Sequence, residues 1–234
     1  AYVKISDGCN RFCSFCMIPY IRGRYHSRNA ESIISEVRNL VAGGVREIVL
    51  IGQDTGIWGT DFADEDLAEG APRNLAQLLQ AVAEAVRPHN MWVRVLYLQP
   101  EGMTDELIDT IRDTPEVLPY IDIPVQHCDA RILKAMRRSG SRQELEDLFR
   151  DLRERIPGIV IRSTAMVGFP TETDDEFRDL IDFMDTVGFD YTSVFAYSRE
   201  EGSLAAKMEG QVDEEVKLER AQEAMDLAES LGFA

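Results

Sequence analysis

The chain has 234 residues, 44% of them hydrophobic, which is enough to bury a sizeable core in one large domain or two small ones. Against 25 Lys and Arg stand 42 Asp and Glu, and the net charge of −17 argues against a domain that grips a long nucleic acid. No run approaches the roughly 18 consecutive apolar residues of a membrane span. No targeting segment is visible, so a cytoplasmic location is the default expectation.

Strands and helices are predicted to alternate from one end of the chain to the other. Each strand is followed by a helix, the first capped by Asn29 and the fifth opened by a Thr173–Glu176 capping box. Pro124, inside the fourth strand, suggests a bulge or a strand end at that point. The predicted strands cover residues 2–6, 47–51, 92–98, 120–125, 159–167 and 192–197.

Six strand–helix units without a Pro/Gly-rich linker imply a parallel sheet covered by helices, with right-handed connections. Six units cannot close the eight-stranded barrel. The predicted fold class is therefore α/β, an open partial TIM barrel of (β/α)6 form, as one domain over residues 1–234. Ligands of such sheets bind at the carboxyl ends of the strands, which nominates the polar residues found there.

The most informative motif is a group of three cysteines, Cys9, Cys13 and Cys16, close to the first strand. Thiolates select zinc, copper(I) or iron–sulfur clusters. A structural zinc site needs four ligands, and the fourth candidate here is Cys128 or a histidine. Three thiolates on one loop suit a [4Fe–4S] cluster with one open iron. A zinc site and a cysteine trio without metal remain the alternatives, whereas a disulfide framework is disfavoured by the small number and clustering of the cysteines.

The CxxxCxxC spacing, with Phe15 directly before Cys16, resembles the signature of the radical S-adenosylmethionine (SAM) superfamily. The resemblance implies that the three cysteines hold a [4Fe–4S] cluster whose open iron chelates the amino and carboxylate groups of SAM. It also implies that Phe15 lies beside the adenine. The remaining cofactor-binding residues expected from the family and from the strand ends are Gly52, Gln53, Asp54, Gln126, Arg162 and Tyr197. His127 and Cys128 are expected to pack or hydrogen-bond locally.

Further segments along the whole chain resemble the methylthiotransferases within that superfamily, notably those at residues 52–55, 122–127 and 167–173. Gln53-Asp54-Thr55 and Gln126-His127 look like the RimO type, which methylthiolates an aspartate of a small-subunit ribosomal protein. The type that acts on an isopentenylated adenosine in transfer RNA is the alternative, and it typically has Gln-Asn in place of Gln53-Asp54. Such enzymes also have an N-terminal domain with a second [4Fe–4S] cluster and a C-terminal β-domain. Neither has a counterpart in this sequence, so the isolated core is expected to cleave SAM without inserting sulfur.

The resemblance also implies a mechanism and its partners. An electron donor such as flavodoxin or ferredoxin reduces the cluster, SAM is cleaved, and the resulting radical removes hydrogen from the β-carbon of the aspartate. The basic segment 18–28 could attract the substrate carboxylate through Arg22, Arg24 and Arg28, although a solvated loop is the alternative. Direct nucleic-acid binding by this domain is not expected. A non-enzymatic zinc-binding barrel is the remaining hypothesis of a different class.

Overall fold

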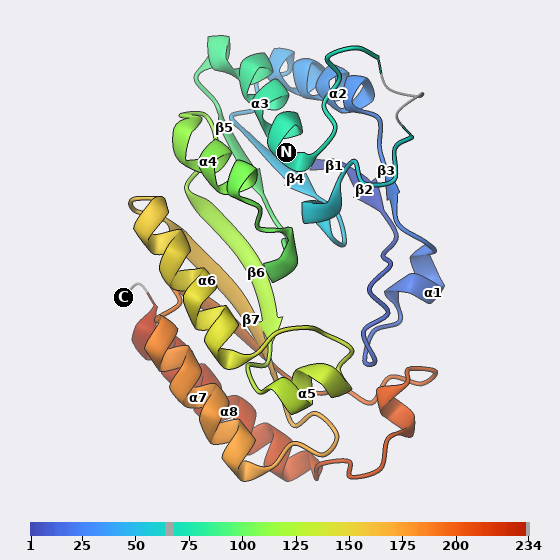
Figure 1. Ribbon diagram of the computed structural model, residues 1–234, viewed down its shortest axis with the longest axis vertical. Helices are drawn as coiled ribbons and strands as arrows, with labels where there is room; N and C mark the ends of the chain where they lie inside the picture. The colour runs from blue at the N-terminus through green and yellow to red at the C-terminus, as the bar shows by residue number, and fades with distance from the viewer. Residues whose placement is uncertain (64–67, 233–234) are drawn as a thin grey trace. The chain divides into compact units, whose positions relative to one another are not determined.

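The computed structural model describes residues 1–63 and 68–232, and within it the chain divides into two compact units (Figure 1). All six predicted strand–helix units are present. The first unit contains Ala1–Asn10, Arg22–Asp122 and Leu152–Ile159, and the second contains Arg11–Ile21, Ile123–Asp151 and Val160–Ala234.

The first unit is built on a parallel sheet of three strands in the order β1-β4-β5. Its apolar side chains Val3, Ile48, Leu50 and Val93 are completely buried. Helix α2 packs against β1 and α3, and α3 packs against α4. The elements are β1 (Tyr2–Lys4), α2 (Ala30–Ala42), β4 (Glu47–Ile51), α3 (Leu75–Val86), β5 (Trp92–Val95) and α4 (Asp105–Asp113).

Helix α2 begins where the sequence predicts, because the Asn29 side chain accepts hydrogen bonds from the backbone N–H groups of Glu31 and Ser32. Ile33 and Val37 of this helix are completely buried, which accounts for its apolar stripe. Asn74 and Thr104 cap α3 and α4 in the same way.

The second unit holds the sheet β6-β7-β8, in which β7 and β8 are parallel and pair Ser163 with Thr192. Helix α7 begins at the predicted capping box, with Thr173 and Glu176 exchanging both bonds. Helix α8 packs against α7, β7 and β8. The elements are β6 (Tyr120–Gln126), α5 (Ala130–Ala135), α6 (Arg142–Arg155), β7 (Val160–Val167), α7 (Asp174–Val187), β8 (Tyr191–Ala196) and α8 (Glu214–Leu231), with β6 and α6 contributing residues to both units.

Three local predictions are wrong. The predicted strand 2–6 is broken, since β1 ends at Lys4 and β2 (Ser6–Asp7) pairs antiparallel with β3 (His26–Ser27). The strand predicted over 92–98 stops at Val95, because Tyr97 has a φ of +62° and cannot continue an extended strand. Pro124 lies inside β6 without ending it, which is tolerated because β6 is an edge strand of its sheet.

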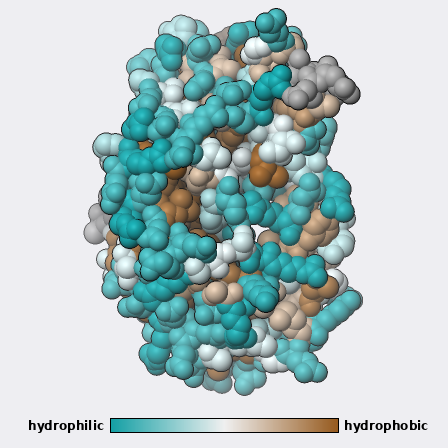
Figure 2. All heavy atoms as spheres, viewed as in Figure 1, coloured by the Kyte–Doolittle hydropathy of each residue, from teal (hydrophilic) through white to brown (hydrophobic). Residues whose placement is uncertain are grey.

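The basic segment 18–28 is not a plain loop. It contains the short helix α1 (Ile18–Arg22) and strand β3. Four short 3₁₀ turns complete the described elements, namely η1 (Thr55–Ile57), η3 (Arg87–His89), η4 (Pro100–Gly102) and η5 (Ala205–Lys207). None of the described helices is both long and apolar enough to cross a membrane. Figure 2 shows a face dominated by hydrophilic residues, in keeping with the acidic composition.

Candidate cofactor site

Gly8 sets the entry to the cysteine motif. It has a φ of +71°, and a Cβ added there would lie 2.1 Å from the carbonyl oxygen of Arg24. The next residue, Cys9, donates its backbone N–H to the carbonyl of Gly23 at 3.2 Å. Only glycine accepts both this backbone conformation and this close approach. The basic segment therefore lies directly against the start of the motif.

Ser14 anchors the other half of the motif inside the second unit. Its N–H donates to the carbonyl of Met136 at 3.0 Å, and its Oγ donates to the carbonyl of Ala135 at 2.8 Å. Its own carbonyl accepts the N–H of Ala205 at 2.8 Å. Ser14 is buried, and these three bonds attach the segment between Cys13 and Cys16 to the end of α5 and to η5.

All four cysteines are free thiols. Cys128 is buried as predicted, while Cys9, Cys13 and Cys16 are half-buried. The backbone N–H of Ile18 donates to Sγ of Cys16 at 3.4 Å, whereas burial is the larger influence and raises the pKa of that thiol. Over residues 1–63 and 68–232, no three His, Cys, Asp or Glu side chains are gathered as ligands of a metal ion.

The donor chemistry of the motif nevertheless fits an iron–sulfur cluster, because three partly accessible thiols come from one segment of eight residues. Cys9 belongs to the first unit, and Cys13 and Cys16 to the second. Their joint role as cluster ligands stays a prediction.

The segment after β4 carries an unsatisfied acceptor. Oε1 of Gln53 is buried and has no hydrogen-bond partner among the residues that the structure describes. Gly52 leaves no room for a Cβ, which would lie 2.3 Å from Oγ of Ser6, and the Asp54 side chain is fully buried. Thr55 fastens the turn by donating its Oγ to the carbonyl of Leu96 at 2.7 Å. A buried acceptor without a protein partner fits a ligand ammonium group, such as the amino group of SAM.

At the end of β6, Gln126 adopts a left-handed backbone conformation with a φ of +69°. His127 follows it and is completely buried, with Nδ1 accepting the N–H of Asp129 at 3.0 Å. Burial lowers the pKa of His127 to about 4, so the imidazole is neutral at physiological pH. The prediction that His127 is bonded locally is confirmed.

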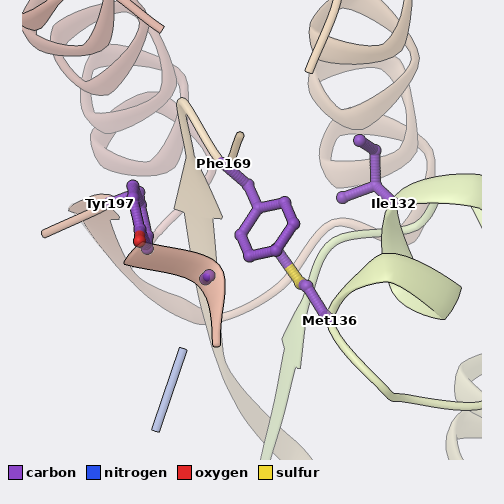
Figure 3. Packing of buried hydrophobic residues seen from close by; sticks show 5 residues of the cluster. Ile132, Met136, Phe169 and Tyr197 are labelled. Carbon is purple, nitrogen blue, oxygen red and sulfur yellow. The ribbon is translucent and has the colours of Figure 1, made fainter. Parts of the chain in front are cut away.

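Phe15 and Tyr197 share one apolar cluster, in which Tyr197 is 2% exposed. Figure 3 shows Phe169 between Tyr197 and Met136. The rings of Phe169 and Tyr197 meet edge to face, with their centroids 5.6 Å apart. The structure thus shows packing for both residues, and their predicted contacts with the cofactor stay predictions. Arg162 donates to Oγ of Ser193 at 3.1 Å, across the β7–β8 pair.

The three arginines of the basic segment differ in their surroundings. Arg22, the last residue of α1, and Arg24 are exposed. The Arg28 guanidinium instead bonds to Ser32 and Glu36 of α2 and to the carbonyl of Lys4. Arg28 therefore braces α2, which is a structural role that the sequence does not reveal.

Four residues with close contacts in or near the motif and strand ends were not selected from the sequence, namely Gly8, Ser14, Glu172 and Arg220. Gly8 and Ser14 lie beside or within the cysteine motif, and that position was the available signal. Glu172 and Arg220 bond to each other in the second unit, 48 residues apart in the chain. Glu172 lies in the segment 167–173 that resembles the methylthiotransferases, which was the available signal, whereas Arg220 looks like a surface residue of a charged helix.

A comparison with known protein families identifies the family of this chain and thereby its cofactors. Residues 3–184 match the model of the radical SAM superfamily. The chain belongs to the radical SAM superfamily. Its cofactors are accordingly SAM and a [4Fe–4S] cluster.

Solved structures with a similar fold agree with the assignment of this chain to the radical SAM superfamily. Coproporphyrinogen III oxidase from Escherichia coli matches with a TM-score of 0.68 at 15% identity, over 100% of this chain and 52% of its own. The radical SAM methyltransferase TsrM from Kitasatospora setae matches with a TM-score of 0.66 at 19% identity, over 84% of this chain and 36% of its own. These likenesses confirm the predicted fold class, the α/β partial barrel of a radical SAM core.

Curated relatives of this radical SAM chain are much more similar in sequence. A protein of Clostridium novyi is 42% identical over 231 residues, and one of Geobacter sulfurreducens is 44% identical over 233 residues. Both carry the name ribosomal protein uS12 methylthiotransferase RimO. The matches cover 99% and 100% of this chain, and the chain spans about half the length of these relatives.

Proposed function

We propose that the chain is the radical SAM core of a methylthiotransferase that modifies the β-carbon of an aspartate in the small-subunit ribosomal protein uS12. The observation that carries the proposal is the identity of 42–44% with proteins of that name, over practically the whole chain. The Gln53-Asp54-Thr55 and Gln126-His127 segments, which resemble this type rather than the transfer-RNA type, support it.

The proposed cofactor site assigns a role to each group of residues. Cys9, Cys13 and Cys16 hold the [4Fe–4S] cluster, and the N–H of Ile18 stabilises the Cys16 thiolate. The orphan Oε1 of Gln53 accepts a hydrogen bond from the SAM amino group. When bound, the cluster and SAM supply the one-electron chemistry that opens an unactivated C–H bond.

The polypeptide binds and orients the reactants. Gln126, at the end of β6, faces the ribose, and Arg162 provides a planar fork for the methionine carboxylate. The exposed Arg22 and Arg24 attract the carboxylate of the substrate aspartate to the rim of the site. Arg28 has no part in this proposal, because its guanidinium is bonded to α2.

Three further features belong to the proposal. Transfer of the methylthio group uses a second [4Fe–4S] cluster, held on an N-terminal domain of the kind that these enzymes possess. A flavodoxin or ferredoxin supplies the electron, and the reaction takes place in the cytoplasm. All three are proposed from the resemblance to the methylthiotransferases.

The core of the proposal is tested by anaerobic reconstitution of the chain with iron and sulfide, followed by addition of dithionite and SAM. We expect about four irons per chain and release of 5′-deoxyadenosine. The Cys13→Ala variant should lose both, whereas the Cys128→Ala variant, which changes a thiol outside the motif, should keep both. Zinc without iron or sulfide would instead favour a non-enzymatic metal-binding barrel.

The substrate is tested separately with the enzyme that carries the second cluster. Purified uS12 and unmodified transfer RNA are offered in parallel, and the methylthio mass increase is measured on each. Modification of uS12 alone is the expected result. Modification of transfer RNA alone would leave the radical SAM assignment intact but overturn the proposed substrate.

A further inference from the structure

A single buried carboxylate joins three elements of the second unit. Both carboxylate oxygens of Glu172 accept the backbone N–H of Gly168, at 2.9 and 3.0 Å. Arg220 of α8 donates to Oε1 at 2.8 Å, and Nε2 of His127 lies 3.6 Å from Oε2. The side chains of Glu172 and His127 are fully buried, and that of Arg220 is 8% exposed. The residues that contact Glu172 thus come from the ends of β6 and β7 and from helix α8.

The hydrogen-bonding state of His127 follows from its neighbours. Since Nδ1 accepts the N–H of Asp129, the proton of the neutral ring is on Nε2, the atom that faces Glu172. Nε2 has no hydrogen-bond partner among residues 1–63 and 68–232, and 3.6 Å is too long for one. The Nε2 donor thus lies near the Glu172 carboxylate, and a small approach of the two groups would complete the bond.

Both strand ends have left-handed backbone conformations, and the one at Gln126 is strained because it is not a glycine. Gln126, directly before His127, has a φ of +69°, and such a conformation persists in a non-glycine residue only where its surroundings enforce it. Gly168 has a φ of +71°, and the side chain of Lys217 from α8 lies where a Cβ would be, 2.3 Å away. Gly168 is contacted by Glu172 and by Lys217 of α8, and His127, the neighbour of Gln126, lies against the same carboxylate.

We propose that Glu172 is a positioning residue for the SAM site. It fixes His127, and through it Gln126, relative to the turn at Gly168, while Arg220 holds the carboxylate in place from α8. The inference rests on the proposed role of Gln126 in cofactor binding and deepens it. SAM affinity then depends on a helix and a carboxylate that do not themselves touch the cofactor.

The two nitrogens of His127 allow a matched pair of variants. His127→Gln offers an amide N–H near the position of Nε2, whereas His127→Asn retains an acceptor near Nδ1 and offers nothing toward Glu172. We expect His127→Asn, which removes the N–H that faces the Glu172 carboxylate, to weaken SAM binding about tenfold, the size of effect typical of residues that orient the ligands of a bound site. His127→Gln keeps a donor toward Glu172 but gives up the bond from the Asp129 N–H, and it should bind SAM more tightly than His127→Asn does. Glu172→Gln, which removes the charge and one acceptor, should resemble His127→Asn.

Binding is measured as the Kd of SAM for the chain reconstituted with its cluster, with iron content determined for every variant. Hydrogen exchange of the protein without cofactors provides a readout independent of activity. In His127→Asn and Glu172→Gln, the peptides covering 124–130 and 167–173 should exchange about tenfold faster, with smaller changes elsewhere. Arg155→Ala is the control, because it removes ion pairs to Asp105 and Asp109 in the first unit without touching either strand end. It should lower the melting temperature while leaving SAM affinity unchanged.

Wild-type SAM affinity and exchange in a folded Glu172→Gln or His127→Asn protein would overturn the inference. If Glu172→Gln does not fold, the His127 pair decides, and equal affinities for its two members would refute the positioning role. A wild-type chain that takes up its cluster but binds no SAM would contradict the proposed function instead. In that case the exchange data alone decide whether Glu172 couples the two strand ends.

Discussion

Gly8 offers a direct test of how backbone geometry supports the cysteine motif. Gly8 and Gly23 both have positive φ, +71° and +80°, but a Cβ on Gly8 meets backbone and one on Gly23 has nothing within 4 Å. Gly23→Ala therefore isolates the cost of the left-handed conformation, about 1 kcal/mol. Gly8→Ala adds a collision in which the carbonyl oxygen of Arg24 lies 2.1 Å from the new Cβ.

Relief of that collision requires a backbone shift of about 1 Å, since carbon–oxygen contacts below about 3 Å are not sustained. Overpacking of this kind costs about 1–3 kcal/mol. The total for Gly8→Ala is then about 2–4 kcal/mol, against about 1 kcal/mol for Gly23→Ala. At this chain length, a difference of about 2 kcal/mol corresponds to about 4–8 °C in melting temperature.

The same shift should disturb the cluster, because the displaced segment includes Gly23, whose carbonyl accepts the N–H of Cys9. Thermal unfolding followed by circular dichroism and iron content after anaerobic reconstitution are measured on both variants. We expect Gly8→Ala to melt lower than Gly23→Ala and to take up less iron. Equal melting temperatures, or full iron uptake by Gly8→Ala, would refute the reasoning.

Three further predictions concern single residues. Burial lowers the pKa of His127 to about 4 in the folded protein, against an ordinary value of 6.5, so between these pH values the unfolded chain binds more protons. The free energy of unfolding should therefore fall by about 3 kcal/mol from pH 7 to pH 4. Denaturant titrations should show that this free energy depends less on pH in His127→Gln, and an unchanged pH dependence would contradict the assignment. Ser14→Ala removes a bond to the carbonyl of Ala135 and should lower that free energy by about 1 kcal/mol, measured by urea unfolding, with exposed Ser230→Ala as a neutral control. Tyr197→Phe should leave the Kd of SAM within about twofold if packing is the main role of this ring, and a large loss of affinity would instead support its predicted contact with the cofactor.

The cysteine motif and the alternation of elements were accessible from the sequence because both are local patterns. The spacing of Cys9, Cys13 and Cys16 indicated a thiolate-bound cluster and the radical SAM superfamily, and the family comparison agrees on the superfamily. The capping signals at Asn29 and Thr173 placed two helix starts correctly, because a capping side chain bonds to backbone only two or three residues away.

Features that depend on contacts between distant segments were not accessible. The pairing of β2 with β3, the bonds from Arg28 to α2 and the packing of Phe15 against the cluster that contains Tyr197 all join residues whose proximity no periodicity encodes. The interruption of the first predicted strand has the same origin, since Ser6 pairs with Ser27 on the other side of the cysteine motif.

The sequence by itself indicated the cofactor chemistry, because the cysteine spacing suits a thiolate-bound cluster and resembles the radical SAM signature. It also determined the order of strands and helices, because hydrophobic periodicity is a property of neighbouring residues. Only the tertiary structure decided which residues support the site. The burial of Glu172 between His127 and Arg220, and the close approach of Arg24 to Gly8, are consequences of packing between segments far apart in the chain.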